Sequence, residues 1–148
     1  MGLFNSFDVS ASGLTAQRFR MDIIAENVAN ANTTRTEDGT PYVRKVVTFE
    51  EKGDSKSFSK VFHHVLNNKR SGGVKVGGVF EDTWTQANMV YDPSHPDADE
   101  NGYVTYPNVN TVTEMTNLID ASRSYEANAT AFDASKAIAT KGLDMLNG

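Results

Sequence analysis

The residues that come closest to a chemical site are the acidic run Asp97-Ala-Asp99-Glu-Asn101-Gly102. Oxygen-bearing side chains at positions one, three and five, with glycine at position six, form the first half of a calcium-binding loop. Position twelve is Asn108, where such a loop needs a bidentate glutamate, and Pro96 stands where the entering helix should be. We therefore interpret the run as a polar turn that leads into a strand, with a calcium-binding module as the alternative.

The histidines and glycines provide no better site. His63 and His64 are adjacent on a predicted strand, so they point to opposite faces and cannot easily share a metal ion. His95 lies in a proline-rich turn, and the glycines of residues 72–78 lack the spacing and the lysine of a phosphate loop. The sequence predicts no catalytic, cofactor-binding or metal-binding residues, and thus a protein that is not an enzyme.

Composition excludes further classes of protein. A net charge of −5 argues against a nucleic-acid binder, which needs a basic face. No run of 18 apolar residues occurs, so we expect no direct membrane insertion. The first residues lack a basic segment followed by an apolar core, so we expect no cleaved secretory signal. The chain has no cysteine, which excludes disulfides and thiolate metal sites.

The longest predicted element is a C-terminal helix over residues 109–148. Apolar and aromatic residues recur there every seven positions, with intermediate positions four residues on, which is typical of a helix packed along another helix. A helix of about 35 residues is roughly 50 Å long and cannot bury its apolar edge within a small globule. The residues of the main row are Leu118, Tyr125, Phe132, Ala139 and Leu146.

A second helix, over residues 3–32, offers a partner. Phe7, Leu14, Met21 and Val28 are spaced by sevens, and Ile24 lies on the adjoining row, which Ser10 and Gln17 interrupt. A pair of helices this polar buries too little to offset chain entropy. We therefore expect the terminal helices to pack together, to be loose in the free monomer and to become ordered on assembly.

The middle of the chain, residues 36–108, contains all four prolines and reads as a small antiparallel β module. The predicted fold is α+β, with a helix at 1–35, an inserted β module at 36–108 and a helix at 109–148, the two helices forming one coiled-coil-like core. The candidate strands are Tyr42–Phe49, Ser57–Leu66, Gly73–Phe80 with a bulge or turn at Gly77-Gly78, Met89–Tyr91 and Tyr103–Tyr106.

A polar and aromatic cluster on the C-terminal helix has two interpretations. Arg123, Tyr125, Glu126 and Asn128 form either a solvated face or a contact between subunits, where arginine and tyrosine are favoured. A helix that its own chain cannot cover supports the second. The predicted core and interface residues are Phe7, Leu14, Met21, Ile24, Val28, Met115, Leu118, Arg123, Tyr125, Asn128, Phe132 and Leu146.

Three motifs resemble a known family. Residues 12–18 (Ser-Gly-Leu-Thr-Ala-Gln-Arg) and 20–33 resemble the N-terminal motif of bacterial flagellar rod and hook proteins. Met115, Ile119, Ala121 and the residues of 123–128 are similar to the C-terminal motif of that family. The segment Val90–Asn110 is most similar to its proximal-rod members.

The resemblance implies a structural subunit of the proximal rod, without cofactors. In that family the terminal helices form a hollow helical tube that transmits torque, and the β module lies outside it. The implied partners are further copies of the chain, other rod proteins and the junction between export gate and basal body. The implied location is the periplasm-spanning rod, reached by type III export without a cleaved signal peptide. A generic coiled-coil subunit of another secretion apparatus stays as an alternative.

Overall fold

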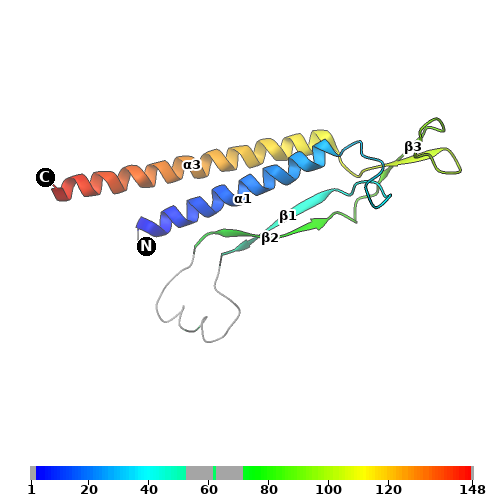
Figure 1. Cartoon of the computed structure of the whole chain (residues 1–148). Coiled ribbons are helices and arrows are strands. Elements are labelled where there is room, and N and C mark those ends of the chain that lie inside the picture. The colour runs from blue at the N-terminus through cyan, green and yellow to red at the C-terminus, as the bar shows by residue number, and fades with distance from the viewer. Residues whose placement is uncertain (1–2, 53–61, 63–71, 148) are drawn as a thin grey trace. The chain divides into compact units, whose positions relative to one another are not determined.

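The computed structural model describes residues 3–52, 62 and 72–147, and along the chain one long helix precedes and another follows two pairs of strands (Figure 1). This confirms the α+β fold with terminal helices around an inserted β region. Positions 63 and 64, and most of the candidate strand Ser57–Leu66, lie outside the described residues. No described helix has the length and apolarity that a bilayer span requires.

Helices α1 (Leu3–Ala29) and α3 (Thr111–Asn147) have capped ends next to the strands. Asn30 ends α1, because its side chain donates to the Glu26 carbonyl at 3.0 Å and accepts the Thr33 hydroxyl at 3.1 Å. Asn110 begins α3: its Oδ1 accepts the N–H groups of Val112 at 3.0 Å and Thr113 at 3.1 Å, the arrangement of an N-cap. Asparagine side chains therefore set both boundaries.

Strands β1 (Lys45–Glu51) and β2 (Val74–Glu81) form one two-stranded sheet. The Lys52 N–H donates to Gly73 at one end and the Asp82 N–H donates to Arg44 at the other, so the strands run antiparallel. β1 begins three residues later than predicted, because the backbone N–H groups of Tyr42 and Arg44 donate outside the sheet. β2 continues through Gly77 and Gly78, where the sequence predicted a bulge or turn.

Strands β3 (Asn88–Tyr91) and β4 (Tyr103–Tyr106) lie where two short strands were predicted, and they pair as an antiparallel hairpin. The register places Tyr91 opposite Tyr103, and their rings meet edge to face at 5.2 Å. Gly102 precedes β4 with φ of +81°, a left-handed conformation that glycine adopts without strain. The glycine of the calcium-loop pattern therefore serves the turn of this hairpin.

The chain divides into two compact units, each of which takes part of both helices and part of the strands. The predicted division at residues 36 and 108 stays a prediction. Unit 1 comprises residues 1–19, 49–77 and 122–148, and unit 2 comprises residues 20–48 and 78–121.

In unit 1 the helices run antiparallel and meet through small side chains. Phe7 packs edge to face on Phe132 with ring centroids 5.1 Å apart, and Gly13 lies against Asn128. A Cβ atom on Gly13 would stand 2.6 Å from the Asn128 Oδ1, so the Asn128 side chain occupies the space that a larger residue would need. The Ser12 hydroxyl accepts the Val74 N–H at 3.0 Å and so attaches β2 to α1.

In unit 2 the core is small and partly polar. Ile24, Val104 and Ala121 are its buried apolar residues, together with the ring of Tyr42. Asn27 and Glu114 are each only 1% exposed, which is unusual for an amide and a carboxylate. The polar residues of this core form the cluster described below.

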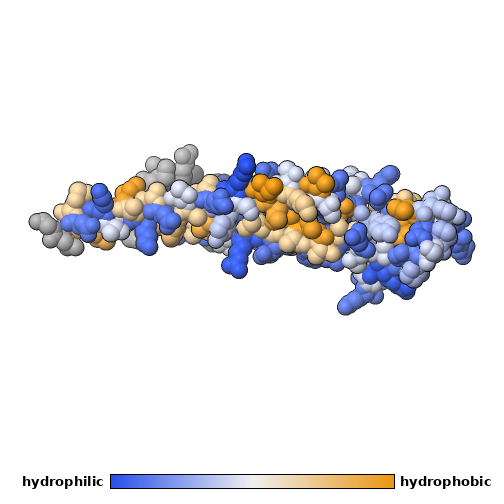
Figure 2. All heavy atoms as spheres, turned by 90° about the horizontal axis from the view of Figure 1, so that it is seen from above, coloured by the Kyte–Doolittle hydropathy of each residue, from blue (hydrophilic) through white to orange (hydrophobic). Residues whose placement is uncertain are grey.

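Large apolar side chains remain on the surface of both units. Figure 2 shows apolar residues gathered among polar ones on one face of the molecule. On α3 the exposed side chains include Val112, Met115 and Ile119 in unit 2, and Ile138 and Met145 in unit 1. Many bulky apolar side chains of the described residues therefore face outward, while polar groups such as Asn27 and Glu114 are buried.

Candidate functional site

The best-built site of the described residues is a buried polar cluster in unit 2. Its centre is Glu114, which lies in the first turn of α3 just after the Asn110 cap. A carboxylate in this turn is favoured by the helix dipole. The side chain turns inward and is almost fully buried, so its charge needs partners within the protein.

Arg44 supplies the opposing charge. Its Nε and Nη2 donate to the Glu114 Oε1 at 2.9 and 2.8 Å, and its Nη1 donates to the Asp82 Oδ2 at 3.2 Å. Burial lowers the pKa of Arg44, but the hydrogen bonds and charge of Glu114 and then of Asp82 outweigh burial and raise the pKa. The guanidinium is thus held in its charged form between two carboxylates.

Asp82 is held ionised chiefly by its own turn. The Thr85 hydroxyl and N–H lower the pKa of Asp82 most, burial opposes them, and the Trp84 N–H and Arg44 add to the lowering. Its carboxylate therefore both shapes the loop after β2 and neutralises Arg44. Hydrogen bonds to the charged form are the general cause of such a depressed pKa.

Asn27 of α1 joins the second oxygen of Glu114 to β1. Its Nδ2 donates to the Glu114 Oε2 at 3.0 Å and to the Lys45 carbonyl at 2.8 Å. Its Oδ1 accepts the Tyr42 hydroxyl and the Lys45 N–H, both at 2.9 Å. The amide thereby uses its full hydrogen-bonding capacity, and one side chain links α1, β1 and α3.

Tyr42 and Lys45 close the cluster on the α1 side. Burial, followed by the negative charges of Glu26, Glu114 and Glu81, raises the pKa of Tyr42 to about 12. The Lys45 ammonium pairs with Glu26 and lies 5.7 Å from the centre of the Tyr42 ring. The cation therefore lies over the ring within the range of a cation–π interaction.

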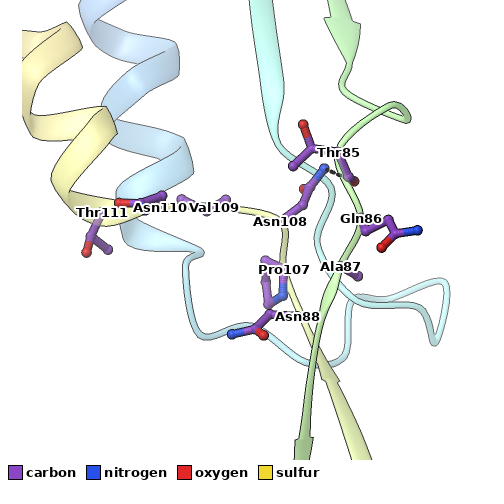
Figure 3. A pocket seen from close by; sticks show the side chains of 9 residues that line it. All are labelled: Thr85, Gln86, Ala87, Asn88, Pro107, Asn108, Val109, Asn110 and Thr111. Carbon is purple, nitrogen blue, oxygen red and sulfur yellow. Dashed lines mark hydrogen bonds between the residues drawn. The ribbon is translucent and has the colours of Figure 1, made fainter.

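Asn108 ties the segment before α3 to both edges of the cluster. Its Oδ1 accepts the Arg44 N–H at 2.9 Å, and its Nδ2 donates to the carbonyls of Asp82 at 2.6 Å and Thr85 at 3.1 Å. Figure 3 shows Asn108 and Thr85 on the wall of a pocket of about 490 Å³. No titratable side chain lines this pocket, which spans residues 85–88 and 107–111.

The cluster is a structural network that connects elements of the fold, and we call it a joint. Each of its charged side chains has a partner of opposite charge, and Arg44 and Asp82 are both shifted toward their ordinary charged forms, as in a structural ion pair. Among residues 3–52, 62 and 72–147, no group of three His, Asp or Glu side chains could hold a metal ion. The geometry holds two helices and a strand at fixed positions.

The carboxylates of the calcium-loop pattern have partners within the chain. The Asp97 carboxylate accepts the Thr34 hydroxyl at 2.8 Å and lies 3.5 Å from the Arg35 guanidinium. The Asp99 Oδ1 accepts the N–H groups of Asn101 and Tyr103 at 2.9 and 2.8 Å. Asp99 therefore stabilises the turn that precedes β4, and Asp97 attaches the same loop to the segment of Thr34 and Arg35.

The residues predicted from the heptads occupy different environments. Phe7 meets Phe132, Asn128 lies on Gly13, and Ile24 is buried. Leu14, Met21, Val28 and Leu118 are half-buried, whereas Met115, Arg123 and Tyr125 are exposed. The Leu146 side chain lies outside the described part of the structure. Their role as subunit contacts stays a prediction.

Several of the deepest positions are ones that the heptad analysis did not select, although it did select the buried Ile24. In α3 the row of Glu114, Ala121, Asn128, Ser135 and Gly142 is buried or half-buried, and in α1 Ser10 and Gln17, which seemed to interrupt a row, lie on the inner side. These rows hold small or polar residues. The cluster residues Asn27, Tyr42, Arg44, Asp82, Asn108 and Glu114 were likewise missed.

The comparisons with known proteins agree with this geometry. Residues 7–35 match the family model described as "Flagella basal body rod protein", and residues 100–145 match "Flagellar basal body rod FlgEFG protein C-terminal". These ranges contain Asn27, Asn108 and Glu114 of the cluster.

Relatives match over almost the whole chain. The flagellar basal-body rod protein FlgC of Bacillus subtilis is 44% identical, over 98% of this chain and 99% of the relative. FlgC of Borreliella burgdorferi is 42% identical over 100% of both chains, and FlgC of Salmonella typhimurium is 39% identical over 98% of both. The predicted resemblance to the flagellar rod family is thereby confirmed: the chain belongs to the flagellar basal-body rod protein FlgC family.

Proposed function

We propose that this chain is a structural subunit of the flagellar proximal rod, and that it assembles with its own copies and other rod proteins into a hollow helical shaft. The observation that carries the proposal is the distribution of side chains on the long helices. The inner rows of α1 and α3 are small or polar, while Ile138 and Met145 of α3 are 66% and 79% exposed. An assembly of such helices buries apolar surface that one copy leaves in water.

The polar cluster suits a subunit that transmits torque. Arg44, Asn27 and Glu114 connect both helices and β1 through hydrogen bonds of 2.8 to 3.0 Å. A fully satisfied buried network fixes one geometry, because any displacement leaves a charged or polar group without a partner. The cluster would therefore act as a rigid joint within each subunit.

The chain would reach the rod by flagellar type III export without a cleaved signal peptide. This part of the proposal rests on membership of the rod family. Mass spectrometry of the chain recovered from purified basal bodies tests it, since the first residues should be retained. Recovery of a form trimmed at a signal-peptidase site would contradict it.

The assembly proposal is tested by Leu14→Asp in a flagellated bacterium that lacks its own copy of the protein. Leu14 is half-buried on α1, and a charge there opposes packing between helices. We expect loss of motility and of rods in electron micrographs of basal bodies. Asp8→Asn on an exposed site of the same helix should leave rods intact. Normal rods with Leu14→Asp would contradict the proposal.

Ordering on assembly has a separate measurement. In the free monomer, amides of α3 in unit 1 should exchange with solvent faster than amides of α1 and α3 that flank the cluster in unit 2. Incorporation into rods should protect both sets. Equal protection of both sets in the dilute monomer would show that the helices need no neighbouring copy.

A further inference from the structure

The ionisable residues are divided unequally between the two units. Unit 2, all of which is described, has twelve Asp and Glu against four Arg and Lys, a formal charge of −8. Unit 1 has ten Arg and Lys against seven Asp and Glu in its sequence, but its described residues carry six of each and are neutral in sum. The net charge of −5 is therefore distributed unevenly, with the negative surplus in unit 2.

Most of the cationic side chains of unit 2 form ion pairs with carboxylates of the same unit. Arg44 pairs with Asp82 and Glu114, Lys45 with Glu26, and Arg35 with Asp97. Residues 78–121 contain no arginine or lysine at all. The negative surplus must therefore be balanced by solvent ions or by a partner.

The β3–β4 hairpin carries part of this negative surplus close to exposed apolar side chains. Met89, Tyr91 and Tyr103 are 60%, 63% and 42% exposed, and the strand register places them on one face. Asp99 and Glu100 lie in the connection just before β4 and are also exposed. We call Met89, Tyr91, Tyr103, Asp99 and Glu100 the hairpin face.

A complementary surface lies on α3 within unit 1. At helical spacing, one row of exposed residues contains two cations and no carboxylate. Its apolar members provide area, and its alanines allow close approach of an aromatic ring. We call this row the outer stripe: Arg123, Ala127, Ala134, Ile138, Lys141 and Met145.

We propose that the hairpin face of one copy docks on the outer stripe of a second copy. Tyrosine rings with adjacent carboxylates match a row of arginine, lysine and apolar side chains, since such rings pack on both methylene groups and cations. The inference rests on the proposed function, because it assigns the partner surface of an assembling subunit.

The charge division also selects the direction of assembly. A two-fold contact that joined hairpin face to hairpin face would bring together two units of −8, whereas a head-to-tail contact places Asp99 and Glu100 against the row that holds Arg123 and Lys141. Head-to-tail contacts build an open filament or tube when the rotation between successive copies does not close into a ring. The distribution of charge thus favours growth of a polymer over formation of a closed dimer.

The test uses the absence of cysteine from the chain. A strain lacking its own copy is supplied with two tagged forms together, Tyr91→Cys and Met145→Cys, and purified basal bodies are treated with a short bismaleimide cross-linker. We expect a dimer that carries both tags. Thr40→Cys, an exposed site of unit 2 outside the hairpin, replaces Tyr91→Cys in the control and should give monomer only.

A charge-reversal pair gives a second readout. Glu100→Lys and Lys141→Glu should each reduce the number of rods, and the combination should restore it, because the ion pair returns with reversed sign. Normal rods that contain both cysteine forms without the mixed dimer would overturn the docking inference and leave the proposed function standing. Absence of the chain from basal bodies would overturn both.

Discussion

Units 1 and 2 hold the same two helices together by different means. In unit 2 a buried carboxylate, a guanidinium and an amide bind one another and leave no hydrogen-bonding position of Asn27 unused. In unit 1 the helices meet at a glycine, an asparagine and a pair of phenylalanine rings. One unit is fixed by specific polar bonds, and the other by close approach over a small area.

The difference is consistent with a subunit that must be rigid at one place and adaptable at another. Polar networks tolerate little displacement, since a broken bond leaves a buried charge. A contact of small side chains buries little apolar area. Packing against a neighbouring copy would bury more of it and so add stability. We therefore expect substitutions in the cluster to affect the monomer, and substitutions on the helices of unit 1 to affect assembly more.

The largest expected effect on stability is that of Glu114→Ala. The change leaves Arg44 with only Asp82 and removes a partner of Asn27, so the free energy of unfolding should fall by about 3–5 kcal/mol. Urea unfolding followed by circular dichroism measures it. Glu126→Ala, at an exposed site of the same helix, should change stability by less than about 0.5 kcal/mol. Equal effects of the two variants would show that the cluster is not a joint.

The next effect is a loss of stability at alkaline pH. The pKa of Tyr42 is about 12 in the folded chain, whereas an unfolded tyrosine has a pKa of about 10. Between these values the unfolded state releases the proton first, so the free energy of unfolding falls as pH rises, by up to about 2–3 kcal/mol.

Tyr42→Phe isolates this contribution. The variant is less stable at neutral pH, because the Asn27 Oδ1 loses a donor, but it lacks the phenol titration. Its free energy of unfolding should therefore fall less than that of the wild type between pH 9 and pH 11.5. A parallel fall in both proteins would assign the alkaline loss to other groups.

A smaller effect on the free energy of unfolding is expected for Gly13→Ala, and its sign should depend on the residue at position 128. Alanine favours a helix over glycine by about 1 kcal/mol, but its Cβ would stand 2.6 Å from the Asn128 Oδ1. Overpacking of this kind costs about 1–3 kcal/mol, so Gly13→Ala should destabilise the wild type modestly.

The same substitution should stabilise a chain that already carries Asn128→Ala, because the clash is gone. The difference between the two backgrounds is the coupling energy in a double-mutant cycle. If Gly13→Ala had the same effect in both, Asn128 would not limit the approach of the helices.

The smallest effect is that of calcium. Asp97 and Asp99 already accept hydrogen bonds from Thr34, Asn101 and Tyr103, so the loop needs no ion to form its turn. Titration calorimetry with millimolar calcium should give no heat, and the melting temperature should not change. Heat that disappears with Asp97→Asn would restore the calcium-binding alternative.

Much of the architecture was predictable because it depends on local signals. Asn30 and Asn110 mark the helix ends by hydrogen bonding their own backbone neighbours, and Gly102 marks the turn before β4. The Val90–Asn110 motif led to the rod family, which the relatives confirm. In contrast, Gly77 and Gly78 suggested a break in a strand that cross-strand bonds keep continuous.

The cluster was not predictable from the same signals. Asn27 and Glu114 are 87 positions apart, and neither residue type is expected to be fully buried. Arg44 appeared to belong to a strand, and Asp82 to a loop. Their roles follow from partners that only the folded chain brings together.

The sequence by itself determined the two long helices, the two short strands near residues 89–91 and 103–106, and the family, because periodicity, capping residues and motifs act within short stretches. The tertiary structure decided which helix rows face inward. It selected the rows of Gly13 and Glu114 over the more apolar rows, because backbones that approach closely need small side chains and because a buried carboxylate is stable only beside its arginine.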